Sequence, residues 1–383
     1  MELLFKEEHK IIRKSIRDFL QKEFYPKIEE WEEIGEIPRE YFEKFADMGY
    51  FGMKFPEDYG GTGPDLVAET VLIEEVARLG AGGVAGSLGA HSQLALPHIY
   101  KHGSEEQKNK YLVPGINGEK KSALAITEPN CGSDVASIET TAVKEGNQYI
   151  VNGTKTFITG GPTADFVVLA AKTDLKEKHK GISLFIVDTE TPGFFVNKKL
   201  DKLGWRSSDT GELAFQDCAV PVEQLIGEEN MGFFYIMQGF EWERYIMAVG
   251  SVITAEIAYE EAVKYAKERK QFGRPIGKFQ VVQHYIADML TNIEAARRLN
   301  YYVLECMLEG VMCLKEAAMA KLFAGEMAKQ VVDKALQIHG GYGYMMEFPV
   351  QRWWRDERLS TIGGGTSEIM KEIIAGQIGL KNL

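Results

Sequence analysis

Glu243 is the residue whose surroundings most clearly predict chemistry. It lies in the segment GFEWERYIMAVG, which we expect to be helical. Its neighbours on the same helix face are the glycine and apolar residues Gly239, Phe240, Ile246 and Met247. A carboxylate on such a face is costly to bury when ionised, so its pKa should rise toward that of a general base. The alternative interpretation is a structural ion pair with a distant arginine.

Glu241 precedes Arg244 by three residues, and we expect these two side chains to form an ion pair. Glu241 is therefore interpreted as mainly structural. Elsewhere, the four cysteines form no CxxC pair and the seven histidines no HExxH motif, so no metal site is predicted.

Two segments rich in hydroxyls and glycines follow predicted strands. ALAITEPNCGSD (123–134) offers Thr127 and Ser133 beside exposed backbone N–H groups, and FITGG (157–161) places an aromatic ring before a hydroxyl and two glycines. Such loops can hold a polar heterocycle or a phosphate. Each is equally consistent with an ordinary turn after a strand.

Three further segments combine glycine or amides with aromatic or cationic residues. They are ERKQFGRPIGKFQ (268–280), QIHGGYGY (337–344) and IGGGTSEIM (362–370). Glycine removes the Cβ, so that backbone can touch a pyrophosphate, and a helix start at Thr366 would present N–H groups to an anion. Helix caps and turns explain each one separately, but their joint occurrence favours a ligand.

Three consecutive blocks of structure must position these segments. Residues 1–120 show apolar residues at helical spacing, 121–230 contain short β-branched and aromatic runs, and 231–383 return to long helical periodicity. We expect an N-terminal helical domain, a β middle domain and a C-terminal helical domain. No glycine segment follows a strand into a helix with GxGxxG spacing, which argues against a Rossmann fold.

Within the middle block, a β-hairpin is predicted at Asn152-Gly153. The runs on either side, 149–151 and 155–159, read as short strands, and Asn-Gly favours a two-residue turn with positive φ at both positions.

The composition is that of a folded protein. Of 383 residues, 45% are hydrophobic and 26% charged, and the formal net charge is −12. This excludes disorder as the dominant state, and the acidic balance without a basic run argues against nucleic acid or an anionic membrane as partner. No apolar run is long enough to span a bilayer and no signal peptide is recognised, so we expect a cytoplasmic protein without membrane insertion.

The ordered motifs ALAITEPNCGSD, FITGG, KLGWRSSDTGELAF, ERKQFGRPIGKFQ, QIHGGYGY and IGGGTSEIM resemble those of the acyl-CoA dehydrogenases. The resemblance covers the full length. It implies a mainly α fold with a β-barrel-like middle domain and a C-terminal four-helix bundle. It also implies FAD held without a Rossmann domain, and a homotetramer arranged as a dimer of dimers.

The resemblance places the cofactor residues in groups. The flavin ring would lie against Ala125, Ile126, Thr127 and Ser133, with Phe157, Ile158 and Thr159 on its other side. The pyrophosphate and adenosine would be held across a subunit interface by Arg269, Gln271, Phe272, Gln280, Gln337, Gly340 and Gly341, with Thr366 and Glu368 nearby. Ser133 and Arg244 would also contact the substrate.

One position departs from the common family pattern. Where many members carry the catalytic base in a YEGT-like motif, this chain has Gly364. A subgroup that includes isovaleryl-CoA and long-chain type enzymes places the base on a helix, directly before an arginine. Glu243-Arg244 fits this subgroup, so the resemblance also makes Glu243 the base.

The implied activity is FAD-dependent oxidation of a fatty or branched acyl-CoA to the trans-2-enoyl-CoA, as in β-oxidation of fatty acids. Electrons would pass to an electron-transfer flavoprotein. The alternatives are an acyl-CoA oxidase on the same fold and a non-catalytic FAD- or CoA-binding scaffold, the latter suggested by Gly364. The sequence leaves chain length and branching open.

Overall fold

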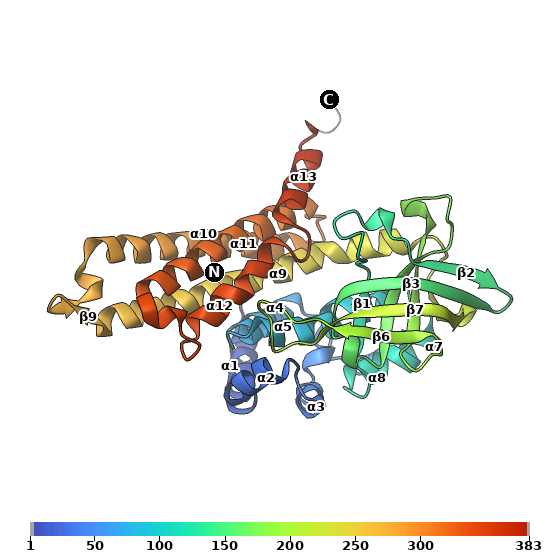
Figure 1. The fold of residues 1–383 in the computed structure, drawn as a ribbon, viewed down its shortest axis with the longest axis horizontal. Helices are drawn as coiled ribbons and strands as arrows, with labels where there is room; N and C mark the ends of the chain where they lie inside the picture. The colour runs from blue at the N-terminus through green and yellow to red at the C-terminus, as the bar shows by residue number, and fades with distance from the viewer. Residues whose placement is uncertain (1–3, 381–383) are drawn as a thin grey trace.

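The computed structural model describes residues 4–380 (Figure 1). The N-terminal third is helical, as predicted. Its helices are α1 (Glu7–Glu23), α2 (Ile28–Ile34), α3 (Arg39–Asp47), α4 (Leu66–Ala77), α5 (Gly82–Gly89), α6 (Leu96–His102), α7 (Glu105–Gln107) and α8 (Val113–Ile116), and a π-helical segment, η4 (Ala90–Ala95), joins α5 to α6. The aromatic side chains of Phe24, Trp31 and Phe45 lie almost wholly inside this part and contact one another edge to face or tilted.

The middle third is a sheet, also as predicted. Its strands are β1 (Ser122–Ala125), β2 (Thr141–Glu145), β3 (Gln148–Thr159), β4 (Phe166–Lys172), β5 (Ile182–Asp188), β6 (Phe194–Lys199), β7 (Thr210–Pro221) and β8 (Leu225–Ile226). They form one eight-stranded sheet in the order β6-β7-β3-β2-β4-β5-β8, with β1 added in parallel to β4. Strands β4 and β5 are apolar and buried along nearly their whole length, as expected of central strands.

The predicted hairpin at Asn152-Gly153 is wrong. Both residues lie inside the continuous strand β3, at a bulge where the pairing with β7 shifts register. A Cβ on Gly153 would lie 2.4 Å from Thr140 Oγ1, so this glycine serves close packing. The chain turns instead before β3, where Gly146 has φ +60°.

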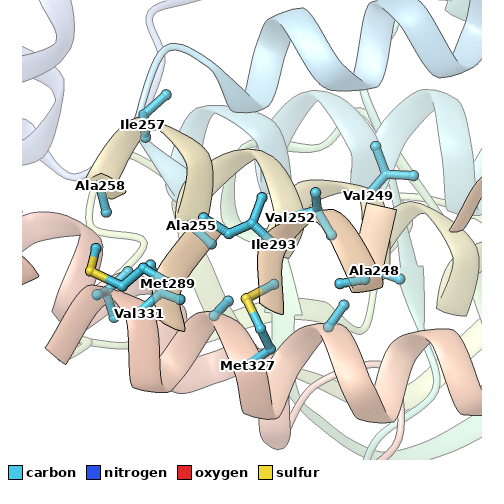
Figure 2. Close-up of a cluster of buried hydrophobic side chains, with 14 of the residues drawn as sticks. Ala248, Val249, Val252, Ala255, Ile257, Ala258, Met289, Ile293, Met327 and Val331 are labelled. Carbon is cyan, nitrogen blue, oxygen red and sulfur yellow. The ribbon is translucent and has the colours of Figure 1, made fainter. Parts of the chain in front are cut away.

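The C-terminal third is a group of helices, as predicted. It contains α9 (Gly232–Glu268), α10 (Gln280–Leu308), α11 (Leu314–His339), α12 (Val350–Glu357) and α13 (Ser367–Gln377), with a small hairpin of β9 (Lys270–Gln271) and β10 (Arg274–Pro275) between α9 and α10. Small residues such as Ala255 and Ala328 let α9 and α11 approach closely, and Met289, Ile293 and Met327 fill the space between the three long helices (Figure 2).

Helix α9 runs along most of the molecule (Figure 1). Its first residue, Gly232, packs against Ser183 of the sheet, and its last residue leads into the β9–β10 hairpin at the far end of the helical part. At 1.5 Å per residue, its 37 residues span about 55 Å. Among residues 4–380, no helix is long and apolar enough to cross a membrane.

Candidate active site

Glu243 lies in the first half of α9 with a half-buried side chain. Burial raises the pKa of its carboxyl, and the positive charges of Arg244 and Lys321 oppose this rise. A carboxylate in such a place can accept a proton from a weak acid because its basicity is increased while it stays partly accessible.

The turn at Gly364 faces Glu243. An added Cβ on Gly364 would lie 3.5 Å from Glu243 Oε1 and 3.3 Å from Met247 Cγ. Gly364 and Gly365 have φ of +61° and +93°, a left-handed conformation that favours glycine. A side chain at position 364 would therefore start in contact with the Glu243 carboxylate, so a carboxylate can reach this location either from the helix or from the turn.

The predicted ion pair between Glu241 and Arg244 is wrong. The Glu241 carboxylate accepts a hydrogen bond from the Cys313 amide, 3.3 Å away, at the start of α11, which remains a structural role. Arg244 is buried, its guanidinium lies 5.5 Å from the centre of the Phe240 ring, and its Nε has no hydrogen-bond partner among residues 4–380. An unpartnered, buried guanidinium N–H beside Glu243 is available to a ligand.

The face of α9 that carries Glu243 has glycines one turn before and two turns after it. His98 lies 3.3 Å from an added Cβ on Gly239, whereas no atom of residues 4–380 lies within 4 Å of one on Gly250. On the facing segment, an added Cβ on Gly89 would meet, among the same residues, only Gln93 Cγ, at 4.0 Å. The space beside Gly250 and Gly89 is therefore open to an extended apolar group.

The two polar segments of the sheet meet at their strand ends. The Thr156 amide donates a hydrogen bond of 2.8 Å to the Thr127 carbonyl, which joins the loop after β1 to the end of β3. Phe157 follows with a side chain that is 68% exposed and a φ of +59°. A left-handed, exposed phenylalanine is costly unless its ring has a partner, which is typical of a ligand site.

The remaining predicted flavin residues of the sheet differ in exposure. Ser133 is exposed in its loop, and Thr127 and Thr159 are half-buried. Ala125, Ile126 and Ile158 have side chains inside the core. These three residues can therefore present only backbone atoms to a ligand.

A buried ion pair beneath this loop was not predicted. The Lys155 ammonium donates to the Ile126 carbonyl (2.9 Å) and to Glu128 Oε1 (2.7 Å), and Glu128 also accepts from the Thr140 amide (3.0 Å). Lys155 is fully buried. No local pattern indicates it, because the pairing of β3 with β7 shifts register between Lys155 and Ile158, so that side chains do not alternate regularly between faces there. The pair fixes both ends of the segment that carries Thr127.

Replacement of Lys155 by methionine is expected to lower the free energy of unfolding by about 3–5 kcal/mol, because it leaves the Glu128 carboxylate buried without its counter-charge. The midpoint of unfolding in urea at saturating FAD measures this loss. Lys198→Met, on the exposed surface of β6, is the matched control and should leave the midpoint unchanged. Equal midpoints for the two variants would contradict the assignment.

A cavity of about 470 Å³ lies at the opposite end of the molecule, between the end of α9 and the end of α11. It brings together Arg269, Gln271, Gly340 and Gly341, which lie some 70 residues apart in the chain. Added Cβ atoms on Gly340 and Gly341 would meet no atom of the described part of the chain within 4 Å, so the backbone there is open to close approach. The Arg269 guanidinium, 5.4 Å from the Tyr342 ring, supplies a positive charge.

Other residues predicted to bind the nucleotide lie near the ends of α9 and α11. Gln337 is exposed in the last turn of α11, and Gln280 is exposed at the start of α10. Phe272 is 91% exposed with a φ of +50°, the same combination of exposure and left-handed backbone that Phe157 shows. Thr366 and Glu368 lie elsewhere, at the start of α13, where Thr366 Oγ1 accepts from the Ile369 amide.

The predicted cofactor residues of one chain therefore form two separate groups. Thr127 and Phe157 belong to the sheet at the beginning of α9, and Arg269 lies past its end, about 55 Å along the helix axis (Figure 1). One dinucleotide cannot reach both groups in a single copy.

Comparisons with known proteins cover the whole chain. Family models for acyl-CoA dehydrogenase match in order: the N-terminal domain over residues 6–119, the middle domain over 123–218 and the C-terminal domain over 230–379.

Named relatives and solved structures also resemble this chain over nearly its full length. The 3-(aryl)acrylate reductase of Clostridium sporogenes is 43% identical over 98% of this chain and 100% of its own length. The caffeyl-CoA reductase-Etf complex subunit CarC of Acetobacterium woodii is 43% identical over 98% of this chain and 99% of its own length. The crystal structure of an acyl-CoA dehydrogenase from Geobacillus kaustophilus superimposes with a TM-score of 0.95 at 43% identity, covering 98% of each chain.

Proposed function

This chain belongs to the acyl-CoA dehydrogenase family, whose members are FAD-dependent oxidoreductases, and from that membership we propose that it interconverts an acyl-CoA and its trans-2-enoyl-CoA with Glu243 as the base. The observation that carries the proposal is the 3.5 Å separation between Glu243 Oε1 and the Cβ position of Gly364. Glu243 on the helix supplies the carboxylate that the turn at Gly364 lacks.

We also propose domain boundaries near residues 120 and 230.

The α-hydrogen of a thioester is weakly acidic, so its removal needs a strong base and a polarised carbonyl. Glu243, with its raised pKa, takes the proton. We assign the Gly364 amide as a donor to the thioester oxygen, because its turn faces Glu243. Arg244, buried beside the base with a free Nε–H, orients the thioester side of the substrate. FAD, when bound, supplies the acceptor for the β-hydrogen as hydride.

The residues present fit FAD when two copies are paired. Thr127, Ser133 and Phe157 of one copy would hold the flavin ring, with the exposed Phe157 side chain as an aromatic contact. Arg269, Gln271 and the open backbone at Gly340 of the other copy would hold the pyrophosphate and adenosine. We propose a homotetramer built from two such pairs.

The acyl group is proposed to lie between α9 and the α5–η4 segment. Glu243, Met247 and Gly250 share one face of α9, and Gly89 faces open space on the opposite segment. This arrangement suits an extended apolar chain of fatty-acid type.

Replacement of Gly250 by leucine is expected to lower kcat/KM for long acyl-CoAs by about tenfold or more and to leave butanoyl-CoA unaffected, because the new side chain fills open space two turns beyond the base. A series of acyl-CoAs of increasing length measures this, with Gly250→Ala as the smaller control. An equal loss at every length would exclude this path for the chain.

The electron acceptor is proposed to be an electron-transfer flavoprotein. The name of the Acetobacterium woodii relative places that protein in a complex with such a partner. The reverse reaction, reduction of an enoyl-CoA, is the second candidate, because two relatives at 43% identity are named reductases. In that direction the protonated Glu243 would return the α-proton, as microscopic reversibility requires.

The deciding experiment is anaerobic mixing of the FAD-loaded protein with a panel of straight, branched and aryl acyl-CoAs. We expect at least one to bleach the flavin absorbance, and the best one identifies the substrate class. Reoxidation is then measured separately with electron-transfer flavoprotein, with oxygen and with the matching enoyl-CoA. Fast turnover with oxygen alone would indicate an oxidase, and a panel without any bleaching would refute the proposal.

A further inference from the structure

Lys321 is a buried lysine of α11 to which the mechanism above gives no role. The residue is 2% exposed, and burial lowers the pKa of its ammonium to about 8. Within the described residues, no carboxylate oxygen lies within 4.0 Å of Nζ, and the ammonium donates instead to the Gly365 carbonyl at 2.5 Å. Keeping a cation at such a place costs stability, so the group is expected to serve the site.

The carbonyl that Lys321 holds belongs to the turn opposite the base. Gly364 and Gly365 are both left-handed, and an added Cβ on Gly365 would lie 2.6 Å from Met370 Cε. The turn therefore lies against Met370 of α13, and the hydrogen bond from Lys321 holds its carbonyl. The position of the Gly364 amide relative to Glu243 depends on both supports.

Lys321 also contributes to the charge around Glu243. The charged groups that act on this carboxylate come from two helices: Arg244 on α9 and Lys321 on α11, while Glu241 acts on Arg244. Lys321 is itself faced by Glu326 of α11 and by Glu357 of α12. Burial raises the pKa of Glu357 to about 7, so near neutral pH this carboxyl is partly protonated and offsets only part of the lysine's charge.

We propose that Lys321 is a positioning residue for this reaction: it holds the Gly364–Gly365 turn against Glu243 and keeps a positive charge beside the base. The inference rests on the proposed role of Glu243. Lys321 does not touch the reacting atoms. It acts through the Gly365 carbonyl on the amide next to the substrate, and through space on the ionised carboxylate.

The test replaces Lys321 by methionine, which keeps the apolar stem and removes the donor and the charge. The limiting rate of anaerobic flavin bleaching by the best acyl-CoA is expected to fall at least about tenfold, with less than about a threefold change in the acyl-CoA Kd. Because the base works ionised and loses a stabilising cation, the acidic limb of the rate profile should move upward by about one pH unit.

Three further variants separate the contributions. Lys321→Gln keeps an N–H donor without charge, so it should restore most of the rate but still shift the acidic limb. Lys321→Arg keeps both and should leave the limb in place. Lys315→Met, on a half-exposed lysine of the same helix, is the matched control and should behave as the wild type.

Exchange of the substrate α-hydrogen in deuterium oxide reports on the base step without the redox step, and it should slow in parallel with bleaching. A folded, FAD-loaded Lys321→Met protein with wild-type rate and wild-type acidic limb overturns the inference. If that variant does not fold, an unshifted limb in Lys321→Gln overturns it. Failure of the wild type to be bleached at all would count against the proposed function instead.

Discussion

Replacement of Glu243 by glutamine is expected to lower the rate of flavin reduction by acyl-CoA about 10³-fold, because the amide cannot accept the α-proton. Glutamine keeps the size and polarity of the side chain, so acyl-CoA and FAD affinity should change little. Rapid mixing without oxygen measures the rate, and titration of the flavin spectrum measures binding. In the Glu243→Gln variant, exchange of the substrate α-hydrogen in deuterium oxide should also be lost.

Because Gly364 faces Glu243, the carboxylate can be moved to position 364 as a control for its removal from position 243. The double variant Glu243→Gly, Gly364→Glu moves the carboxylate from the helix to the turn, where its Cβ would start 3.5 Å from the present Oε1 position. We expect partial recovery relative to Glu243→Gly, limited by the cost of about 1–2 kcal/mol for a left-handed residue other than glycine. A Glu243→Gln protein that reduces its flavin at the wild-type rate would refute the assignment of the base.

Two variants that each lose FAD are expected to regain it when assembled together. Phe157→Asp removes the aromatic ring from the residues proposed to hold the flavin. Aspartate tolerates the left-handed backbone there, so folding should be preserved. Gly341→Asp places a carboxylate where the pyrophosphate would lie, in open space. Each variant alone should bind FAD about 100-fold more weakly.

Co-expression with two different affinity tags isolates tetramers that contain both variants, and these tetramers include mixed pairs. Such a pair has one site with both changes and one site with neither, so it should carry FAD and reduce it at the wild-type rate per bound flavin. Absorbance of the purified hybrid measures the flavin content. If the hybrid holds no more FAD than its parents, the two groups of residues do not combine across copies.

Helical periodicity predicted the long elements well. The long helical periodicity of residues 231–383 indicated the block that contains α9, α10 and α11, because these long helices bury apolar residues against one another. Short elements were missed where tertiary contacts decide them. Helix α12 has eight residues, and Arg352 and Trp353 both hold the Gly80 carbonyl, a contact that no local pattern indicates.

The site was predicted unevenly for the same reason. The apolar face around Glu243 is readable from spacing, and its raised pKa follows. The hydrogen bond from Lys321 to Gly365 joins residues 44 positions apart, and the ion pair of Lys155 with Glu128 depends on the pairing of strands. The Asn152-Gly153 prediction failed because a turn signal and a close-packing glycine look alike in one sequence.

Helix α9 would contribute residues to two active sites in the proposed assembly. In the proposed pairing of two copies, the first half of α9 would carry Glu243 in its own copy's site, and the residues after its end, beginning with Arg269, would bind the nucleotide in the other copy's site. One helix of about 55 Å would then belong to two reaction centres. A tilt of α9 that moves Glu243 in one site would also move Arg269 in the other site. A single substitution along α9 would therefore change the rate or the FAD affinity in both sites.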